Sequence, residues 1–339
     1  MTALTCALGP DSAGTVLTRL LREATTSIDA AVYEVGPAYR WAFAAASRRG
    51  VRVRLLLDHH ASDGNALTAA RLIESGGECR VPVSGVHAHA KLLLVDGDRV
   101  AVGTGNLIWR DAPRHPPGPV ALPGRLLAGT REWWSVVSGG GDLGGAALRR
   151  FEAEWTRAGP PPAQWAQARA AAAPPVGVPR PQVEPLHVDL LPSSLRLQLG
   201  GAAIADALEG LITGALRQAL VVVPYVSADA AAPRALVQAM ARARAHGVDA
   251  RLLLGQPPPG PLGDIGRLGV AIRFMDPLRS TVGHAKGLVA DGIVVVSSAN
   301  WSRQGLGPAF EAALQVEHAG AAAYFADAWS RDWGTGIDL

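Results

Sequence analysis

The stretch HAKLLLVDGDRVAVGTGN occupies residues 89–106, and a near copy, HAKGLVADGIVVVSSAN, occupies residues 284–300. Each copy holds an Asp-Gly pair between two apolar runs, which is typical of a β-hairpin. The two hairpins lie about 195 residues apart, a period too long for a solenoid repeat. The repeat therefore indicates a duplicated domain.

The segments around the two hairpins repeat the same order of elements. Apolar, β-branched runs predict strands that end at Tyr33 and Tyr225 and further strands over 51–58 and 248–255. Helix-forming stretches alternate with these strands, at about 11–24, 39–49, 66–75, 203–215 and 233–246. This alternation predicts an α/β fold of two similar domains, each a mainly parallel sheet flanked by helices, related by a pseudo-twofold axis.

A Pro/Ala-rich stretch, GPPPAQWAQARAAAAPPVGVPRPQ, separates the two halves at residues 159–182 and has the composition of a linker. We therefore expect a first domain over 1–158 and a second over 183–339. Because one chain carries both motif copies, a monomer is expected to suffice for a complete site. A second Pro/Gly/Arg-rich segment, residues 110–130, is expected to form a loop over the active site.

The composition of the chain excludes several classes of protein. Of the 339 residues 48% are hydrophobic and 18% charged, which argues against a disordered chain. The sequence has no apolar run of about 20 residues and no secretory start, so we expect a soluble, cytoplasmic protein without a transmembrane segment. Two cysteines, Cys6 and Cys79, are too few for a disulfide framework or a zinc site. Neither a metal nor another cofactor is expected.

Lysine is almost absent from the chain. Of 32 basic residues only Lys91 and Lys286 are lysines, and both lie two positions after the motif histidines. The abundance of Arg, Ala, Gly and Pro indicates a coding bias against lysine. Under such a bias a retained lysine marks a position where a planar guanidinium cannot replace a compact ammonium.

The repeated residues suit chemistry on a phosphate diester. Alternate residues of a strand share one face, so each motif histidine projects together with its lysine. Lysines, amides and hydroxyls can neutralise the nonbridging oxygens without a metal. One imidazole can attack phosphorus while a second protonates the leaving oxygen, and the pKa of histidine near neutrality permits both states.

The two motifs resemble those of the phospholipase D superfamily, whose hallmark is H-x-K-x4-D followed by G-[ST]-x-N. The resemblance covers essentially the whole chain and implies a bilobal α/β fold and a phosphohistidine intermediate. By this resemblance His89 is the nucleophile and His284 the general acid, although the sequence also allows the reverse. The implied phosphate-binding residues are Lys91, Lys286, Asn106 and Asn300, helped by Thr104 and Ser298. The second copy departs from the family at Ser297, where glycine is usual.

Four acidic residues complete the set that the resemblance implies. Glu311, and Glu132 as its counterpart in the first half, match the family's downstream carboxylate that orients a histidine ring. The motif aspartates, Asp96 and Asp291, are expected to be structural, at the turn or at the domain interface.

The motifs do not identify the substrate, because they bind the phosphate that all candidate substrates share. Arginine richness and the Asn300-Trp301-Ser302 sequence favour a nucleic-acid backbone, and hence a nuclease. The alternative is a phospholipase D or phosphatidyltransferase acting on phospholipid head groups, supported by the apolar composition and by GTGNLIWRD at residues 103–111. A non-catalytic nucleic-acid or membrane-surface module is a more distant alternative. Hydrolysis versus transfer and exo- versus endo-cleavage stay open.

Other residues near the motifs have plainer interpretations. His87 is expected at the rim of the site or partly buried, and His59 and His60 at the surface. Trp133 and Trp134 can stack bases or insert into lipid, but at least one of the pair is expected in the core.

Overall fold

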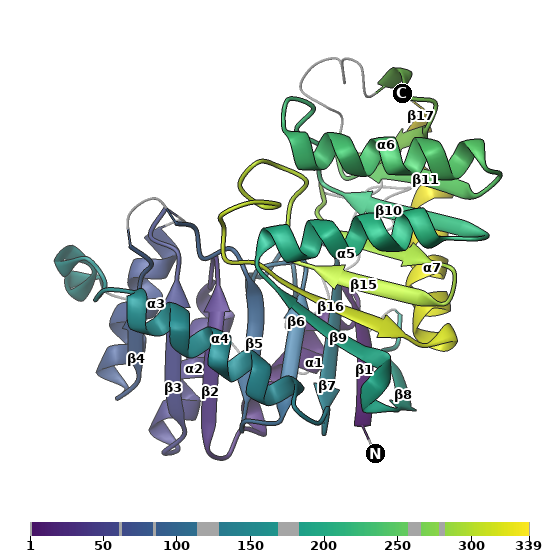
Figure 1. The fold of residues 1–339 in the computed structure, drawn as a ribbon. Coiled ribbons are helices and arrows are strands. Elements are labelled where there is room, and N and C mark those ends of the chain that lie inside the picture. The colour runs from purple at the N-terminus through teal and green to yellow at the C-terminus, as the bar shows by residue number, and fades with distance from the viewer. Residues whose placement is uncertain are drawn as a thin grey trace, which may run out of the picture.

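The computed structural model describes residues 2–60, 63–83, 86–113, 129–168, 183–256, 266–277 and 282–338. Most of the predicted linker (residues 169–182) and of the predicted active-site loop (residues 114–128) lies outside the described residues. Each half forms a sheet with helices packed on it, and β6 and β7 of the first half contact β15 and β16 of the second (Figure 1). Across the described ranges, each helix is too short or too polar to span a bilayer.

The elements of the first half are, in chain order, β1 (Thr2–Gly9), α1 (Ala13–Arg22), β2 (Ser27–Val32), α2 (Pro37–Arg48), β3 (Arg52–Leu57), α3 (Asp63–Glu74), β4 (Glu78–Arg80), β5 (Lys91–Val95), β6 (Arg99–Gly103), β7 (Thr130–Ser138), α4 (Leu143–Arg157), the short 3-10 helix η1 (Ala163–Gln167) and β8 (Leu186–Leu190). Those of the second half are η2 (Pro192–Ser194), β9 (Leu195–Leu199), α5 (Gly201–Gly214), β10 (Gln218–Val223), α6 (Ala231–Ala245), β11 (Asp249–Leu254), β12 (Ala271–Phe274), β13 (Val282–Gly283), β14 (Gly287–Ala290), β15 (Ile293–Ser297), β16 (Ala312–Glu317), α7 (Ala319–Gly334) and β17 (Ile337–Asp338).

Both sheets are mixed, so the prediction of mainly parallel sheets is wrong, whereas the predicted pair of α/β domains is confirmed. The first sheet has the order β4-β3-β2-β5-β6-β7-β1-β8, and along it only β2–β3 and β3–β4 pair in parallel. The second has the order β17-β12-β11-β10-β14-β15-β16-β9, and its parallel pairs are β10–β11 and β11–β12.

The motif hairpins explain the difference. Neighbouring strands are parallel where a helix carries the chain back across the sheet, and antiparallel where a tight turn joins them. The hairpins β5–β6 and β14–β15 insert such antiparallel pairs into the middle of each sheet, beside β2 and β10. Two of the described strands cross between the halves. The strand β8 follows the predicted linker yet pairs with β1 in the first sheet, and β13 of the second half pairs in parallel with β7 of the first.

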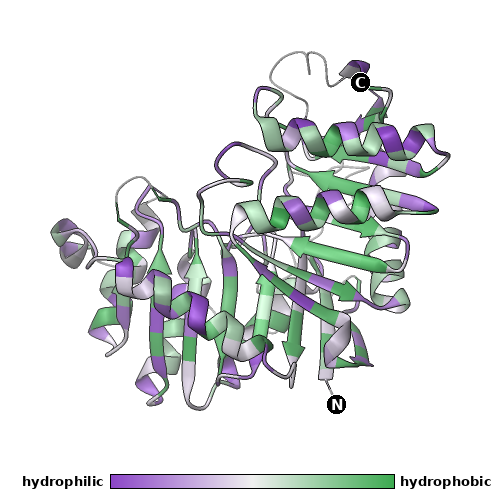
Figure 2. Ribbon diagram, in the orientation of Figure 1, coloured by the Kyte–Doolittle hydropathy of each residue, from purple (hydrophilic) through white to green (hydrophobic). Residues whose placement is uncertain are grey.

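Successive residues of the central strands face different hydrophobic cores. In β5, Leu93 and Val95 pack with the helices α1, α2 and α3, whereas Leu92 and Leu94 pack in a core shared with α4 and with the second half. The strands of both lobes are coloured mostly as hydrophobic in Figure 2, and residues of both lobes belong to this shared core. Because apolar side chains of both halves fill it, the core fixes how the two lobes sit against each other.

Trp133 and Trp134, adjacent on β7, are both buried. Trp134 packs in the core of the first lobe, and Trp133 lies in the shared core with its ring centroid 4.7 Å from that of Phe325. A Cβ added to Gly287 would lie 2.2 Å from the Trp133 ring, so the second motif needs a glycine there for the lobes to approach. Neither tryptophan is placed to stack a base or enter a lipid.

The two motif aspartates hold the hairpin turns against the sheets. Both adopt left-handed backbone conformations, with φ of 54° at Asp96 and 50° at Asp291, which aspartate tolerates better than most residues. Asp96 accepts hydrogen bonds from the backbone N–H groups of residues 25–27 at 2.7–3.1 Å. Asp291 accepts from those of residues 216–218 at 2.9–3.0 Å. In each lobe the carboxylate thereby ties the turn to the chain entering β2 or β10.

Replacing Asp96 by asparagine should lower the free energy of unfolding by about 1–3 kcal/mol at pH 7, because three backbone N–H donors lose a charged acceptor. The backbone hydrogen bonds hold the pKa of Asp96 below its ordinary value in the folded state. Its stabilisation is therefore present above the ordinary aspartate pKa and is lost as pH falls through the folded value. The difference from wild type in urea unfolding should shrink below about pH 4. Asp98→Asn, at the exposed position of the same turn, is the matched control, and an equal loss in both variants would contradict this role.

Candidate active site

Each motif histidine is held by a glutamate from the other lobe. Nδ1 of His89, which precedes β5, lies 2.8 Å from Oε1 of Glu311 near β16. Nδ1 of His284, which precedes β14, lies 2.6 Å from Oε1 of Glu132 on β7. A carboxylate that accepts a proton from Nδ1 fixes the ring orientation and leaves Nε2 as the reactive nitrogen. The site is therefore complete only when the two lobes are docked.

Backbone hydrogen bonds also connect the two lobes beside each histidine–glutamate pair. The N–H of His89 donates to the carbonyl of Phe310 at 3.1 Å, one residue before Glu311. Likewise, the N–H of His284 donates to the carbonyl of Arg131 at 3.1 Å, one residue before Glu132, where β13 pairs in parallel with β7. Backbone hydrogen bonds thus place each histidine opposite its glutamate, independently of the side-chain rotamers.

Thr104 and Ser298, expected to help bind phosphate, contact the glutamates in this structure. Both are fully buried behind the glutamates. The Thr104 hydroxyl donates to Oε2 of Glu132, and the Ser298 hydroxyl donates to Oε2 of Glu311. Each hydroxyl has one proton to donate, and it donates that proton in a hydrogen bond to the carboxylate. These residues position the glutamates that orient the imidazoles.

The two lysines lie against the imidazoles. Nζ of Lys91 is 3.0 Å from Nε2 of His89, and Nζ of Lys286 is 2.8 Å from Nε2 of His284. Lys286 also donates across the lobe interface to the carbonyl of Thr104 at 3.2 Å. Burial lowers the pKa of Lys91 to about 8 and the pKa of Lys286 to about 7. An anion bound beside them would favour their charged forms.

The two halves of the site differ in charge. Burial raises the pKa of Glu132 to about 7, although Lys286 and the Thr104 hydroxyl oppose the shift. Burial also acts to raise the pKa of Glu311, but the neighbouring His89 and Lys91 outweigh it and the pKa is lowered. Glu311 is therefore the more acidic of the two carboxylates, and the ionised partner of His89 at neutral pH.

The histidines themselves resist protonation. Burial lowers the pKa of His89, with Lys91 adding to the shift and Glu311 opposing it. The pKa of His284 lies well below its ordinary value, because of burial and the neighbouring Lys286. The charges of His89 and Lys91 in the first lobe also act on His284 in the second, which places both imidazoles in one electrostatic environment.

The predicted amides lie at equivalent places in the two lobes. Asn106 follows β6, and Asn300 follows β15 at the equivalent place in the second lobe. Within the described structure the side-chain oxygens of both are buried and make no hydrogen bond. Buried polar atoms without a partner are rare in folded proteins, and they suit groups that wait for a ligand.

One acidic residue of the site was missed by the sequence analysis. Asp111 is buried, accepts from the N–H of Asn106 at 2.7 Å, and has a ligand oxygen within 4.8 Å of those of Glu132 and His284. Burial and the charge of Glu132 raise its pKa to about 6. The equivalent position in the second copy is Gly305, so a comparison of the residues after each asparagine was the signal that could have found it.

A family model described as "Cardiolipin synthase, PLD-like domain" matches residues 17–114 and 208–333, which together are well over half of the chain. The chain belongs to this phospholipase D-like family. The two matched regions each contain one histidine–lysine motif. Membership supports a phosphodiesterase-type activity for this phospholipase D-like protein. A search of curated proteins found no match.

Three solved structures are similar to this phospholipase D-like chain, and the first two share its fold. Phosphatidylserine synthase from Haemophilus influenzae Rd KW20 is 13% identical, with 98% of this chain and 87% of that chain covered and a TM-score of 0.65. Polyphosphate kinase from Porphyromonas gingivalis is 16% identical with a TM-score of 0.59; the match covers 96% of this chain but only 50% of the kinase. Nuc, a phospholipase D family member from Salmonella typhimurium, is 19% identical over 43% of this chain and 98% of its own, with a TM-score of 0.37.

Binding of a dianion should be coupled to proton uptake at alkaline pH. At pH 8.5 the lysines with pKa values of about 8 and about 7 are largely neutral, and a bound dianion raises both values, so the protein takes up protons. At pH 6 both are already charged and take up none. Sulfate is a dianion at both pH values, and calorimetric titration in buffers of different ionisation enthalpy measures the protons exchanged.

The variant Lys286→Met removes one of the two lysines that take up a proton at pH 8.5. It should reduce the uptake at pH 8.5 and weaken sulfate binding at both pH values. Binding without proton uptake at pH 8.5 in the wild-type protein would contradict the depressed lysine pKa values.

Proposed function

We propose that the protein is a metal-independent phosphodiesterase that works through a phosphohistidine intermediate. The observation that supports this most strongly is the crossed pairing of His89 with Glu311 and of His284 with Glu132. It leaves Nε2 as the reactive atom of both rings, each beside a buried lysine ammonium. A nucleophile, an acid and two cations are the groups that in-line displacement at a phosphate diester needs.

In the proposed first step, Nε2 of His89 attacks phosphorus, a P–N bond forms and the P–O bond to the leaving group breaks. Nε2–H of His284 gives its proton to the leaving oxygen. In the second step, His284 removes a proton from water or an alcohol, whose oxygen attacks phosphorus and breaks the P–N bond. Lys91 and Lys286 stabilise the charge on the nonbridging oxygens in both steps.

The assignment of roles to the two histidines rests on the difference between the half-sites. The pKa of His284 lies well below its ordinary value in the free protein, so the proposal requires its imidazole to gain a proton as an anionic diester binds. The charge of Asp111 favours that protonated form, and Gly305 occupies the equivalent place near the other half-site. A general acid benefits from such an extra carboxylate. Glu311, ionised at neutral pH, accepts the Nδ1 proton of His89 and so increases the basicity of Nε2, which suits a nucleophile.

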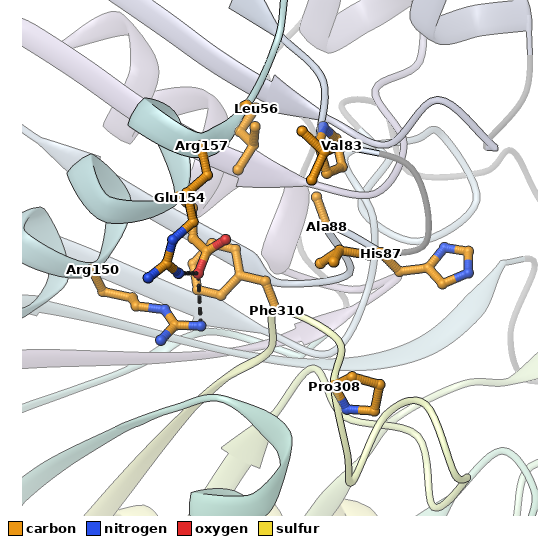
Figure 3. Close-up of a pocket in the computed structure, with 12 residues that line it drawn as sticks. Leu56, Val83, His87, Ala88, Arg150, Glu154, Arg157, Pro308 and Phe310 are labelled. Carbon is orange, nitrogen blue, oxygen red and sulfur yellow. Dashed lines mark hydrogen bonds and ion pairs between the residues drawn. The ribbon is translucent and has the colours of Figure 1, made fainter.

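For the substrate, the first candidate is a nucleic-acid backbone. A pocket beside the site is lined by Arg150, Arg157 and Glu154 on α4, together with His87 and Phe310 (Figure 3). The two guanidiniums share one carboxylate, at 2.8 and 3.5 Å, which leaves an excess positive charge. A polymer with a second phosphate next to the scissile one could use that charge.

The second candidate is a phospholipid diester, and exposed apolar side chains favour it. Trp109, three residues after Asn106, is 51% exposed. Val83, which lines the pocket beside Arg150 and Arg157, is 53% exposed. Tryptophan and aliphatic residues at a rim suit a lipid surface. The description of the matching family model also names a lipid-synthesising enzyme. Cytoplasmic location and a monomeric active unit, both expected from the sequence, are part of the same proposal.

Replacing either histidine should impair turnover of bis-(p-nitrophenyl) phosphate, but in different ways. His89→Asn removes the nucleophile and should form no phosphoenzyme. His284→Asn should slow turnover by about 10²–10⁴-fold and let the phosphoenzyme accumulate, because the second step has lost its base. Intact-protein mass spectrometry in chelator-containing buffer measures the adduct. Phosphate on residue 284 in the His89→Asn variant would reverse the roles, and full turnover by both variants or dependence of turnover on metal would contradict the mechanism. Absence of turnover in the wild-type protein would leave a binding module.

Two surface variants should separate the substrate classes in assays with single- and double-stranded DNA, RNA and phosphatidylcholine vesicles. For a nuclease, Arg157→Ala should lower kcat/KM on an oligonucleotide several-fold, while Trp109→Ala leaves it unchanged. For a lipid enzyme, Trp109→Ala should lower the rate on vesicles. Bis-(p-nitrophenyl) phosphate reaches neither surface, so its turnover should stay the same in both variants. Activity on vesicles but not on nucleic acid would reject the first candidate.

A further inference from the structure

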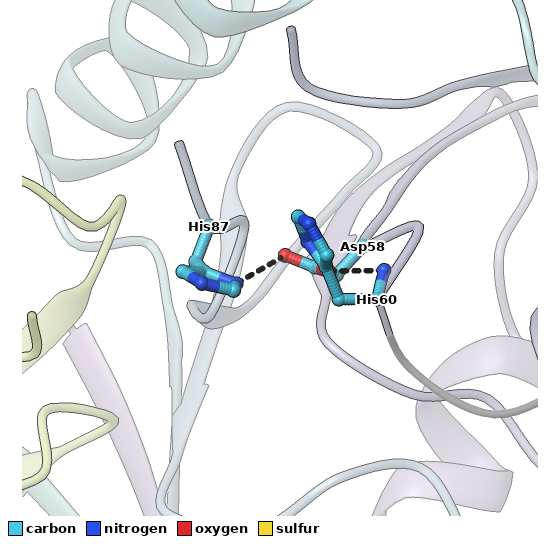
Figure 4. A group of neighbouring side chains, drawn as sticks. All are labelled: Asp58, His60 and His87. Carbon is cyan, nitrogen blue, oxygen red and sulfur yellow. Dashed lines mark hydrogen bonds and ion pairs between the residues drawn. The ribbon is translucent and has the colours of Figure 1, made fainter. Parts of the chain in front are cut away.

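Three side chains with metal-binding atoms converge beside the entrance to the active site. Asp58 directly follows the strand β3, His60 lies two residues further on, and His87 precedes His89 on the chain that enters β5. One ligand atom from each of Asp58, His60 and His87 lies within 4.8 Å of the others (Figure 4). The sequence predicts His60 at the surface and His87 at the rim of the site or partly buried. Only the fold brings them to one carboxylate.

The distances in this cluster suit a small cation. Nδ1 of His60 is 3.2 Å from Oδ1 of Asp58, and Nδ1 of His87 is 3.3 Å from Oδ2. Ligand atoms at about 2.0–2.1 Å from a tetrahedral zinc ion lie about 3.3 Å from each other. Two imidazoles and a carboxylate are a donor set that first-row transition metals prefer over magnesium or calcium.

Backbone groups hold the Asp58 carboxylate in place without help from the imidazole rings. The N–H of Ala88 donates to Oδ2 of Asp58 at 2.9 Å, and the N–H of His60 donates to Oδ1 at 2.7 Å. Asn65 donates to the Asp58 carbonyl at 2.9 Å and so fixes its backbone. A preorganised carboxylate costs less to bring into a coordination shell.

The charge of Asp58 also lacks a strong partner. Its side chain is fully buried, and within the described ranges its ion-pair partners are His60 and His87, which carry charge only when protonated. A buried carboxylate that faces neutral imidazoles is costly, and a bound cation would offset that cost. The two imidazole side chains are 45% and 33% exposed, so an ion can reach them from solvent.

We propose that Asp58, His60 and His87 bind a divalent transition-metal ion, zinc by preference, outside the histidine–lysine pairs. The ring of His87 points away from Arg150 and Glu154 of the neighbouring pocket, which leaves it available to the ion (Figure 3). With three protein ligands, the fourth position of a tetrahedral ion is open to water or to an oxygen of a bound molecule.

The position of the ion gives it a structural effect on the active site. The carbonyl of His87 accepts from the N–H of Phe310 at 2.9 Å, and His89 in turn donates to the carbonyl of Phe310. An ion on His87 would therefore anchor the two chain segments that carry His89 and Glu311. The proposal assigns the ion no part in the displacement at phosphorus.

A second group with metal-binding atoms, Asp111, Glu132 and His284, is a weaker competitor. Its members are already engaged: Glu132 binds the His284 ring, and Asp111 accepts from a backbone N–H. The ammonium of Lys286 lies 2.8 Å from Nε2 of His284 and would repel a cation. Zinc should therefore choose the cluster at Asp58.

Titration of the full, chelator-treated chain with Zn²⁺ tests the proposal. Calorimetry should give one site per chain, and saturating Zn²⁺ should raise Tm. Co²⁺ should give the visible absorption of a four-coordinate ion with nitrogen and oxygen ligands. The double variant His60→Ala/His87→Ala should lose at least about 100-fold in Zn²⁺ affinity, since two of three ligands are gone. His246→Ala, at an exposed histidine on the end of α6, is the matched control and should bind as wild type.

The outcomes separate this cluster from its competitor. Unchanged affinity in the double variant, or loss of the site in His284→Asn instead, would overturn the proposal. If circular dichroism shows that the double variant is not folded, the single His60→Ala variant gives the same readout at the more exposed ligand and should lose at least about 10-fold in affinity. The result does not depend on diesterase activity, so it stands or fails separately from the proposed function.

Discussion

The hydrogen bond between a histidine of one lobe and a glutamate of the other is the interaction on which the site depends. It occurs twice, from His89 to Glu311 and from His284 to Glu132, and the backbone beside each pair makes the same crossing. Neither lobe alone can orient its own imidazole. Duplication therefore has a mechanistic consequence, since each half supplies a reactive group and the carboxylate that positions the other half's reactive group.

The crossing also ties stability to function. Lys91, Lys286, Glu132 and Glu311 are all buried, and removing one partner from such a set leaves an uncompensated charge that costs about 3–5 kcal/mol. Docking of the lobes through the shared apolar core brings the opposite charges together. The remaining imbalance shows as depressed lysine pKa values, which an anionic phosphate would reverse. The same charge arrangement that is costly in the free protein favours substrate binding.

Much of this organisation could be predicted from the sequence, because hairpin signals, strand alternation and a repeated motif are local patterns. Strand direction could not be predicted, because the hairpins β5–β6 and β14–β15 make the sheets mixed although helices and strands alternate around them. The partner of each histidine also could not be read from the chain, because residues 222 positions apart meet only through lobe packing. The motif predicts that the hydroxyl of Thr104 binds phosphate, as its motif neighbours are expected to do. In the fold, this hydroxyl instead lies behind Glu132 and donates to its carboxylate. Asp58 and its two histidines carry no local pattern at all.

The most direct test of the convergence of the two lobes is a crystal structure of the protein with bound tungstate, an oxyanion that resembles a transferred phosphoryl group. Both half-sites are expected on a single anion, with Nε2 of His89 and Nε2 of His284 on opposite sides of the tungsten atom and the ammoniums of Lys91 and Lys286 on its oxygens. A tungstate held by residues of one lobe only, with the second imidazole turned to a different cavity, would contradict the account.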